Sequence, residues 1–266
     1  MGRVVVVDNS GAGGLQPGAL PEACELLRVQ NTGYAAGNNA GLRFLERDAP
    51  QFVLIANPDV FLEPEAVEAC ARFLEMHPGY AVAAPRMCRA DGTPHPLAAW
   101  RERSFFTDIP YTSGLLSRLL GMGRECYPES VLAAEAADVD CVAGSCFLAR
   151  FSMLREAGCF DEGTFLYYEE DILGYRLKRL GYKTAVLGRQ RFLHCEGASV
   201  NRTFGLLRRY RAMQKSRLYF HRRYLKTPAP LYALLCAATV LGVAEKALKT
   251  AFYRLRGAAE AGGSGD

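Results

Sequence analysis

The stretch "FVLIANPD", residues 52–59, joins five apolar residues directly to an Asn-Pro-Asp turn. A short run that is wholly apolar is typical of a strand buried on both faces, as in a parallel sheet. "RVVVVDNS", residues 3–10, repeats the pattern near the start of the chain. Both runs end in an acid-bearing turn, so the sequence predicts two buried strands whose ends hold Asp59 and Asp8.

Strand and helix patterns alternate over the first third of the chain. Residues 64–76 form the clearest helix pattern, because Pro64 suits the first helical position and apolar residues recur at i, i+3, i+4 and i+7. Residues 80–85, "YAVAAP", fit the next strand, and residues 25–31 and 34–48 fit a further strand and helix. This alternation predicts an α/β layered domain.

An insertion and then further strands and helices are predicted to follow. Residues 86–137 are rich in Pro, Gly and polar residues and fit an irregular insertion with one short helix near residues 114–121, "GLLSRLLG". Residues 138–158 fit a strand that runs into a short helix, and residues 183–188 fit another strand. Between them, residues 169–180 fit a helix closed by Gly181.

Cysteine and charge content exclude several classes of protein. Nine cysteines, an odd number without a C-x-x-C pair, argue against a disulfide framework or a zinc knuckle and for a reducing compartment. The net charge is +4, but residues 197–266 contain 13 Lys or Arg against 3 Asp or Glu, which leaves −6 on the first 196 residues. An acidic body with a basic tail predicts two different partners.

The basic tail continues into an apolar stretch. Residues 208–250 join a basic, aromatic segment to 14 uncharged residues at 231–244, a run shorter than the roughly 17–25 residues of a membrane span. We expect a helical tail over 205–257 that lies in the membrane interface, where Lys and Arg meet anionic lipid, and a disordered end at 258–266. The alternative is a basic helical hairpin that packs on the body or on a partner chain. Nucleic acid is not expected, because no recognition motif accompanies the charge.

Three acids stand side by side in "FLYYEEDILGYRL", residues 165–177: Glu169, Glu170 and Asp171. Like charges this close raise each other's pKa, so the cluster suits a proton acceptor that works beside a cation. The start of a helix would offset part of the repulsion. The plainer interpretation is that acids simply favour the first turn of a helix.

The acids that follow strands suggest a ligand site. In open α/β sheets ligands bind at the carboxyl ends of strands, where Asp8 and Asp59 are predicted to lie. Carboxylate oxygens suit a hard divalent cation, Mg²⁺ or Mn²⁺, which usually also binds substrate phosphates. The alternative is that Asp and Asn only form turns after strands. "NTGYAAGNNAG", residues 31–41, offers close backbone approach and amide hydrogen bonds, although it equally fits a loop and a helix start.

Five motifs in order carry a resemblance to a known family: "VVVVDNS", "NTGYAAGNNAG", "IANPDV", "VAGSCFLARFSMLREAGCFDEGTFLYYEED" and "HCEGAS". The chain resembles family-2 glycosyltransferases of the GT-A fold, in particular the bacterial rhamnosyltransferase-like enzymes that build cell-surface polysaccharides. The resemblance covers residues 4–200 and implies a domain over 1–204 with a Rossmann-type, mostly parallel sheet flanked by helices. Family members open with a strand and a helix ahead of the "VDNS" strand. The resemblance therefore implies one of two things: the start codon of this sequence is placed late, or the protein lacks the family's first strand.

By resemblance, residues of several loops line the donor and acceptor sites. Those expected to bind the nucleotide-sugar are Asp8, Asn31, Gly33, Asn39, Asn57 and Asp59. Asn57-Pro58-Asp59 stands where the family has a metal-binding Asp-x-Asp, so Asp59 is the expected ligand of Mg²⁺ or Mn²⁺. His194, in "HCEGAS", matches a family His near the diphosphate and the metal, and is expected to join it. Gly144 and Ser145 would border the acceptor.

The acid triplet matches the family's catalytic motif imperfectly. The family reads Glu-Asp-x-Asp after the aromatics, and here Glu169 and Glu170 take the first two places. Ile172 replaces the final Asp, and Asp171 falls in the unspecified place. We predict that Glu170 is the catalytic base, with Asp171 as the second candidate and Glu169 beside them.

The resemblance implies an inverting glycosyltransferase that moves a sugar from a dTDP-rhamnose or UDP-sugar type of donor to a saccharide or lipid-linked saccharide. It would act in cell-surface polysaccharide synthesis, in the cytoplasm and peripherally on the inner face of a bacterial plasma membrane. One alternative is a non-catalytic nucleotide-sugar-binding or scaffold protein of the same fold. A nucleotidyltransferase is disfavoured, because such enzymes usually carry a Gly-rich, basic loop near the start and this sequence has none there.

Overall fold

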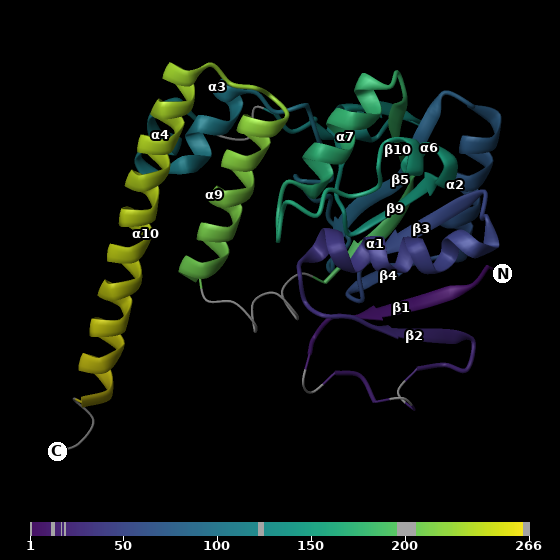
Figure 1. The fold of residues 1–266 in the computed structure, drawn as a ribbon, viewed down its shortest axis with the longest axis horizontal. Helices are drawn as coiled ribbons and strands as arrows, with labels where there is room; N and C mark the ends of the chain where they lie inside the picture. Colours follow the sequence, from purple (N-terminus) through teal and green to yellow (C-terminus); the bar gives the residue numbers. More distant parts are fainter. Residues whose placement is uncertain are drawn as a thin grey trace. The chain divides into compact units, whose positions relative to one another are not determined.

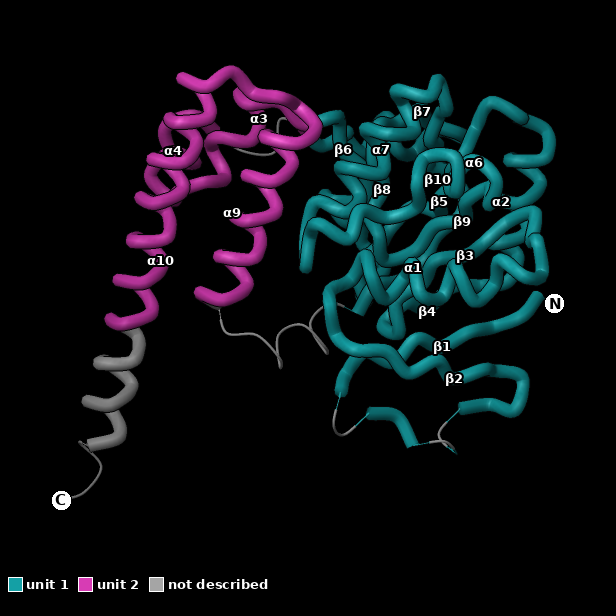
Figure 2. The backbone as a smooth tube through the Cα atoms, viewed as in Figure 1, with its two compact units in different colours: residues 1–102, 126–196 teal, residues 103–125, 197–266 magenta. Residues whose placement is uncertain are grey.

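The computed structural model describes residues 2–11, 14–16, 18, 20–121, 125–195 and 206–262, with side chains as far as Phe252. The chain divides into two compact units (Figure 2): unit 1 comprises residues 1–102 and 126–196, and unit 2 comprises residues 103–125 and 197–266. Unit 2 therefore takes in part of the segment 86–137, which sequence analysis assigned to an insertion of the first domain.

A six-stranded sheet forms the centre of unit 1 (Figure 1). Its strands, in spatial order, are β3 (Phe52–Ala56), β9 (Cys146–Arg150), β5 (Tyr80–Arg89), β10 (Lys183–His194) and β4 (Val60–Leu62), with β7 (Ala137–Val139) also paired to β10. β5 and β10 run parallel, whereas the other pairs of this sheet are antiparallel. The α/β class is confirmed. The expectation of a mostly parallel sheet is wrong, because an apolar run indicates burial on both faces and not strand direction.

A separate pair of strands carries the first predicted acid. β1 (Val4–Asp8) and β2 (Cys24–Arg28) run parallel, as a two-stranded sheet with Asp8 opposite Arg28. Helix α1 (Tyr34–Leu45) packs beside β1, and a Cβ added at Gly37 would lie 3.2 Å from Nδ2 of Asn9. The turn after β1 thus lies against the first turn of α1.

Helices cover both faces of the central sheet. Neighbouring residues of a strand point to opposite faces, and the core divides accordingly. Val82 packs in one cluster with α1, α6 (Phe151–Glu156) and α7 (Glu169–Arg179). Its neighbour Ala83 packs in the opposite cluster with α2 (Pro64–Met76). The flanking helices that the sequence predicted are therefore present on both sides of the sheet.

Local signals set the ends of these helices as predicted. Pro64 is the first residue of α2. α7 is closed by Gly181, whose φ is 83°, and Tyr182 N donates to Leu177 O at 3.0 Å, as in a left-handed helix cap. α1 passes directly into the short 3-10 turn η2 (Glu46–Asp48).

Much of the predicted irregular insertion is regular structure within unit 1. β5 continues to Arg89, past the predicted end at residue 85. β6 (Ala99–Trp100) pairs antiparallel with β8 (Cys141–Val142), and α5 (Glu129–Leu132) precedes β7. The β6–β8 pair places Trp100 beside the segment that leads into β9.

Unit 2 is helical. It contains α3 (Phe105–Asp108), the 3-10 turn η3 (Ile109–Thr112) and α4 (Gly114–Leu120) from the insertion, and α9 (Leu206–Arg223) and α10 (Ala229–Gly262) from the C-terminal region. Phe105 and Ile109 pack with Leu235 and Ala238 of α10. α10 continues to Gly262, into the segment 258–266 that we expected to be disordered, and residues 263–266 lie outside the described part of the chain.

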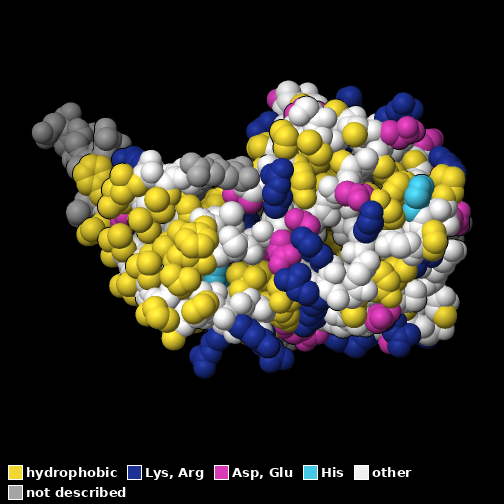
Figure 3. All heavy atoms as spheres, turned by 90° about the horizontal axis from the view of Figure 1, so that it is seen from above, with side chains coloured by type: hydrophobic (Ala, Val, Ile, Leu, Met, Phe, Trp, Pro, Cys, Tyr) yellow, Lys and Arg dark blue, Asp and Glu magenta, His cyan; other side chains and the backbone are white. Residues whose placement is uncertain are grey.

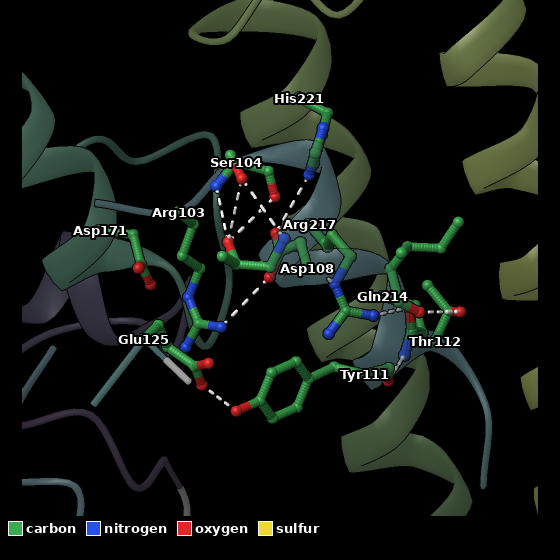
Figure 4. A network of polar contacts seen from close by, with 12 residues as sticks. Arg103, Ser104, Asp108, Tyr111, Thr112, Glu125, Asp171, Gln214, Arg217 and His221 are labelled. Atoms are coloured by element: carbon green, nitrogen blue, oxygen red, sulfur yellow. Dashed lines mark hydrogen bonds and ion pairs between the residues drawn. The ribbon is translucent and has the colours of Figure 1, made fainter. Parts of the chain in front are cut away.

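A buried polar network joins the two parts of unit 2 (Figure 4). Asp108 is fully buried and accepts hydrogen bonds from Arg103 Nη1 and from His221 Nε2, each at 3.1 Å. Arg217 Nε lies 3.8 Å from the same carboxylate and is also buried. Although burial alone would raise the pKa of Asp108, the hydrogen bond from His221 and the charges of Arg217 and Arg103 lower it to about 2. The inserted helices and α9 are therefore one packed body.

Candidate active site

The end of β3 and the start of β9 bring two predicted site loops together. The strands pair antiparallel with Ala56 opposite Cys146, so the residue after β3 lies next to the residue before β9. Asn57 N donates to Ser145 O at 2.8 Å. The segment predicted to bind a metal and the segment predicted to border the acceptor thus lie side by side, although they are far apart in the chain.

Asp59 and His194 meet where β4 pairs with the end of β10. The antiparallel register places Val60 opposite His194, and Cys195 N donates to Asp59 O at 3.0 Å. The Nε2 atom of His194 lies 3.3 Å from Oδ1 of Asp59, and both side chains are 16% exposed. The structure brings together the two residues that sequence analysis assigned to a metal.

This pair fits a divalent cation. Asp59 Oδ1 and His194 Nδ1 are buried, and neither has a hydrogen-bond partner among the residues that the structure describes. A cation beside Asp59 Oδ1 and the facing His194 Nε2 would give that buried oxygen a partner, whereas His194 Nδ1 lies on the other side of the ring and would need a partner of its own. Carboxylate oxygen and imidazole nitrogen are both ligands of divalent metals, and Mg²⁺ is often held by one or two carboxylates plus substrate phosphates. Within the described ranges, no group of three or more His, Cys, Asp or Glu suited to a metal occurs.

The backbone just ahead of the acid triplet is strained. Tyr167 and Tyr168 have φ values of 72° and 73°, in the left-handed region that is costly for bulky residues. Tyr34 N donates to Phe165 O at 3.0 Å, and a Cβ added at Gly33 would lie 2.6 Å from that oxygen. The start of α1 therefore fixes the aromatic loop that leads into the acids.

The three acids have different surroundings. Asp171 is buried, and its Oδ1 accepts a hydrogen bond from Trp100 Nε1 at 2.8 Å. Glu169 is buried, and its burial together with the charges of Glu170 and Asp171 raises its pKa well above the usual range. Glu170 is half-buried and lies over Gly144, where an added Cβ would be 2.2 Å from its Oε1. Of the three, Glu170 alone combines partial exposure with a place against the predicted acceptor loop.

The residues predicted to contact the nucleotide lie around the end of β1 and the start of α1. Asp8 accepts hydrogen bonds from Ser10 Oγ at 2.6 Å, Ser10 N at 3.0 Å and Leu15 N at 2.9 Å. The bonds from Ser10 lower the pKa of Asp8, so its carboxylate holds the loop after β1 in shape. Asn31 is exposed, whereas Gly33 is buried with a φ of 121°.

Asn39 has a structural role, which differs from the expectation that it binds the nucleotide. Its Nδ2 donates to Phe160 O and to Glu162 Oε1, each at 2.9 Å, and its Oδ1 accepts from Phe160 N at 3.0 Å. The side chain is buried, so both ends of the amide are used within the protein. Asn39 ties α1 to the loop ahead of the acid triplet. The sequence could not indicate this, because both partners are more than a hundred residues away.

Sequence analysis did not single out Tyr34, although it is the only aromatic residue of "NTGYAAGNNAG". Its hydroxyl donates to Gly144 O at 2.7 Å and lies 3.2 Å from Asn57 Oδ1. The site therefore includes a half-buried phenol that touches both neighbouring loops.

Comparison with known proteins identifies relatives among glycosyltransferases, although no family model matches the chain. It is 29% identical over 177 residues to the low-salt glycan biosynthesis hexosyltransferase Agl10 of Haloferax volcanii, covering 66% of this chain and 53% of that protein. It is 26% identical over 221 residues to the N-acetylglucosaminyl-diphospho-decaprenol L-rhamnosyltransferase of Mycobacterium tuberculosis, covering 75% and 68%. The chain thus spans about half the length of the first relative and about two thirds of the second.

A solved structure with a similar arrangement is the mannosyltransferase PcManGT from Pyrobaculum calidifontis in complex with GDP-Man and Mn²⁺. The TM-score is 0.48 and the identity 16%, with 97% of this chain and 71% of that chain covered. Both sequence relatives are named as glycosyltransferases, and one as a rhamnosyltransferase. These names confirm the family resemblance that the five motifs predicted.

Proposed function

We propose that the protein is a metal-assisted, inverting glycosyltransferase that uses a nucleotide-diphosphate sugar as donor. The observation that carries the proposal is the meeting of two chemical groups on adjoining loops. One is the largely buried Asp59–His194 pair, and the other is the half-buried Glu170 above Gly144. The names of the two relatives, a hexosyltransferase and a rhamnosyltransferase, support the same reaction class.

In this reaction Glu170 acts as the general base. Its carboxylate removes the proton of an acceptor hydroxyl as that oxygen attacks the anomeric carbon of the donor, an effect typically worth about 10²–10⁴-fold. The bond to the acceptor oxygen forms while the bond to the diphosphate breaks on the opposite face, so one displacement inverts the anomeric centre. The proton ends on Glu170, and the electron pair of the broken bond leaves with the nucleoside diphosphate.

Asp59 and His194 are the residues that would hold Mg²⁺ or Mn²⁺. When bound, the cation neutralises negative charge on the departing diphosphate. Asn57 supplies no carboxylate, so the anionic oxygen of this segment comes from Asp59. We expect turnover to require the divalent cation.

The donor and acceptor are proposed from the motifs and from the names of the relatives. The rhamnosyltransferase-like motifs favour a dTDP-rhamnose or UDP-sugar type of donor, and one relative is named for a decaprenol-linked substrate. We therefore propose a saccharide or lipid-linked saccharide as acceptor, in cell-surface polysaccharide synthesis. The alternative, a non-catalytic nucleotide-sugar-binding or scaffold protein, would bind the donor without turnover.

Unit 2 supports a membrane contact. The segment Ala229–Phe252 of α10 is long and apolar enough to cross a membrane by length and composition, with a mean hydropathy of 1.6. The uncharged run at 231–244 suggested a shorter segment, because it stops at Glu245, whereas the 24-residue segment begins at Ala229 and also takes in Glu245, Lys246 and Lys249. Figure 3 shows hydrophobic side chains gathered over this unit, and those exposed include Phe106, Leu115, Leu119, Leu234, Val240, Leu241, Leu248 and Phe252.

The charge of unit 2 fits an anionic lipid surface. Residues 103–125 and 197–266 contain 16 Lys or Arg against 5 Asp or Glu, a net charge of +11. Basic segments next to apolar surface bind anionic lipid, at about 1 kcal/mol per Lys or Arg near the surface. We therefore place the protein in the cytoplasm, on the inner face of the plasma membrane, with contact through residues 208–250 and through α4. A lipid-linked acceptor would be met at such a surface.

A donor screen tests the proposed reaction. The full chain is incubated with dTDP-rhamnose or UDP-sugars and a saccharide acceptor, with and without Mn²⁺ or Mg²⁺, and nucleoside diphosphate release is measured. Glu170→Gln should lower turnover by about 100-fold or more and leave nucleotide binding intact. Glu68→Gln is the matched control, because Glu68 forms an exposed pair with Arg72 on α2. Unchanged turnover of Glu170→Gln would refute the base assignment. Donor binding without release under any condition would favour the non-catalytic alternative.

Vesicle flotation tests the membrane contact. The full chain should float with vesicles that contain anionic lipid, and less with zwitterionic vesicles or at high salt, where the charges are screened. Leu119→Glu on α4 should weaken flotation, because it puts a carboxylate on a side chain that is 71% exposed. Equal flotation with both kinds of vesicle would remove the charge argument, and no flotation would remove the contact.

A further inference from the structure

Tyr34 contacts three segments of the candidate site at once. Its hydroxyl donates to Gly144 O at 2.7 Å and lies 3.2 Å from Asn57 Oδ1. Its backbone N donates to Phe165 O at 3.0 Å, at the start of the aromatic loop. Gly144 belongs to the loop predicted to border the acceptor, and Asn57 belongs to the loop that carries the proposed metal ligand Asp59. Phe165 belongs to the segment that leads into α7. No other contact described above joins all three.

The backbone around Tyr34 has little freedom to adjust. Gly33 has a φ of 121°, a conformation that side chains rarely adopt, and an added Cβ there would lie 2.6 Å from Phe165 O. The ring of Tyr34 packs edge-on against Phe160, with the centroids 6.3 Å apart. The hydroxyl is therefore held in place from both the backbone and the ring.

The phenol acts as a neutral donor. Burial, and after it the negative charge of Glu170, raises the pKa of Tyr34 far above its usual range, so it keeps its proton at any working pH. A phenol has one proton to donate, and two oxygens share it: Gly144 O at 2.7 Å is the closer acceptor and Asn57 Oδ1 at 3.2 Å the weaker one. Tyr34 is thus suited to holding a peptide in place and not to transferring a proton.

Both loops that the hydroxyl touches carry a reacting group. Gly144 lies directly under Glu170, where a Cβ would be 2.2 Å from Oε1, so movement of this peptide changes the place of the carboxylate. Asn57 is two residues before Asp59 and donates its backbone N–H to Ser145 O at 2.8 Å. A single hydroxyl therefore reaches both the support of the proposed base and the support of the proposed metal ligand.

We infer that Tyr34 is a positioning residue, which fixes the Glu170 side of the site relative to the Asp59 side through the hydrogen bond of its hydroxyl to Gly144 and its contact with Asn57. The inference rests on the proposed function. It adds a residue whose contribution is alignment between base and metal, and which touches neither donor nor acceptor. Misalignment of about 1 Å can cost on the order of 100-fold in rate.

Tyr34→Phe tests the inference, because it removes the hydroxyl and retains the ring packed on Phe160. We expect kcat to fall about 10- to 100-fold, with the KM of the donor within about twofold of the wild-type value. The Mn²⁺ concentration for half-maximal activity should rise severalfold, because the Asp59 loop loses one of its supports. A change that only lowered the folded fraction would reduce kcat and leave the Mn²⁺ dependence as it was.

Tyr182→Phe is the matched control. Tyr182 OH donates to Glu156 Oε2 at 2.6 Å in the same unit, and neither residue belongs to the site. Loss of the Tyr182 hydroxyl should leave kcat and the Mn²⁺ dependence of activity within about twofold of wild type. A second readout is a double-mutant cycle with Asn57→Ala: the effects of the two changes on the Mn²⁺ dependence should be non-additive, because both act through one contact.

The outcomes separate the two claims. If the wild-type chain turns over and Tyr34→Phe matches it in both kcat and Mn²⁺ dependence, the positioning role is wrong while the proposed function stands. Strictly additive effects of Tyr34→Phe and Asn57→Ala also overturn it. If the wild-type chain releases no nucleoside diphosphate with any donor, the proposed function fails, and the inference fails with it.

Discussion

The substitution Gly144→Ala tests whether activity requires the carboxylate of Glu170 to stay in its observed position. A Cβ at residue 144 would lie 2.2 Å from Oε1 of Glu170, whereas ordinary contact begins at 3.4 Å, so the carboxylate must retreat by about 1.2 Å. The obstructing atoms belong to a flexible side chain, and residue 144 needs no positive φ, so the fold should accommodate the methyl group. Displacing a catalytic group by about 1 Å costs on the order of 100-fold in rate, or about 2.7 kcal/mol of barrier.

The assay is nucleoside diphosphate release at saturating donor, together with the nucleotide dissociation constant and the thermal unfolding midpoint. We expect kcat of Gly144→Ala to fall about 100-fold, with both other quantities close to wild type. Gly79→Ala is the control, because a Cβ at residue 79 would meet nothing within 4 Å. If Gly144→Ala keeps the wild-type kcat, Glu170 is not the base in its observed position, and the reasoning from this contact is refuted.

Three further changes test other parts of the structure. Asp59→Asn removes the anionic oxygen beside His194 and should raise the Mn²⁺ concentration for half-maximal activity at least about tenfold, so an unchanged titration contradicts the metal assignment. Burial raises the folded-state pKa of Glu169 above 4.5, so the wild-type free energy of unfolding falls as pH rises above about 4.5. Glu169→Gln removes that loss of stability. The unfolding midpoint of the variant minus that of wild type should therefore grow as pH rises from about 5 to about 8. A difference that did not change with pH would argue against the raised pKa of Glu169. Asp108→Asn leaves Arg217 and His221 buried without their carboxylate and should cost roughly 3–5 kcal/mol of unfolding free energy at neutral pH, measured by denaturant titration with circular dichroism. Because the pKa of Asp108 falls from 3.8 to about 2 on folding, its ionic contribution is lost as pH falls through that range, and a cost that stayed the same at pH 2 would contradict it.

The elements of unit 1 could largely be predicted because local rules set them. Pro64 starts α2, Gly181 closes α7, and the apolar runs at 4–8 and 52–56 are strands as predicted. The expected burial of these two strands on both faces is wrong, because Val4 is 40% and Leu54 is 38% exposed. Strand direction could not be predicted. β9 runs antiparallel between β3 and β5, and its residues would read the same in a parallel sheet, since a strand buried on both faces is uniformly apolar in either direction.

The insertion shows a signal that was present but outweighed. Ser104 forms a capping box with Thr107, and the side chain of Ser113 caps α4. Both are local signs of a helix start. The short helix expected near residues 114–121 is α4, whereas the abundance of Pro and Gly across 86–137 favoured irregular chain where α3 and the other elements of this segment lie. The partner of these helices could not be predicted from local signals, because it is fixed by the contact of Asp108 with His221, far along the chain.

Some features of the candidate site could also be predicted from the sequence, whereas others depend on long-range contacts. Strand ends and family motifs predicted that Asp59 and His194 would meet, and the structure places them 3.3 Å apart. The hydrogen bond from Trp100 to Asp171 and the contacts of Tyr34 were not predicted, because they join segments that no sequence spacing relates. The family resemblance had already placed Glu170 ahead of Asp171 as the candidate base. The different surroundings of the three acids, however, could not be predicted from the sequence.

Several departures from local rules lie around the candidate site, although Ala49, Cys159, Arg86 and Arg150 show similar departures elsewhere in unit 1. Two consecutive tyrosines hold left-handed backbone, which costs of order 1–3 kcal/mol each, immediately ahead of three adjacent acids. Asp59 and His194 each keep a buried polar atom without a partner among the described residues. A folded chain retains such costs where the surrounding structure enforces them, and they commonly mark functional sites. The departures beside Glu170 and Asp59 therefore add a physical reason, separate from any resemblance in sequence, to test these two residues first.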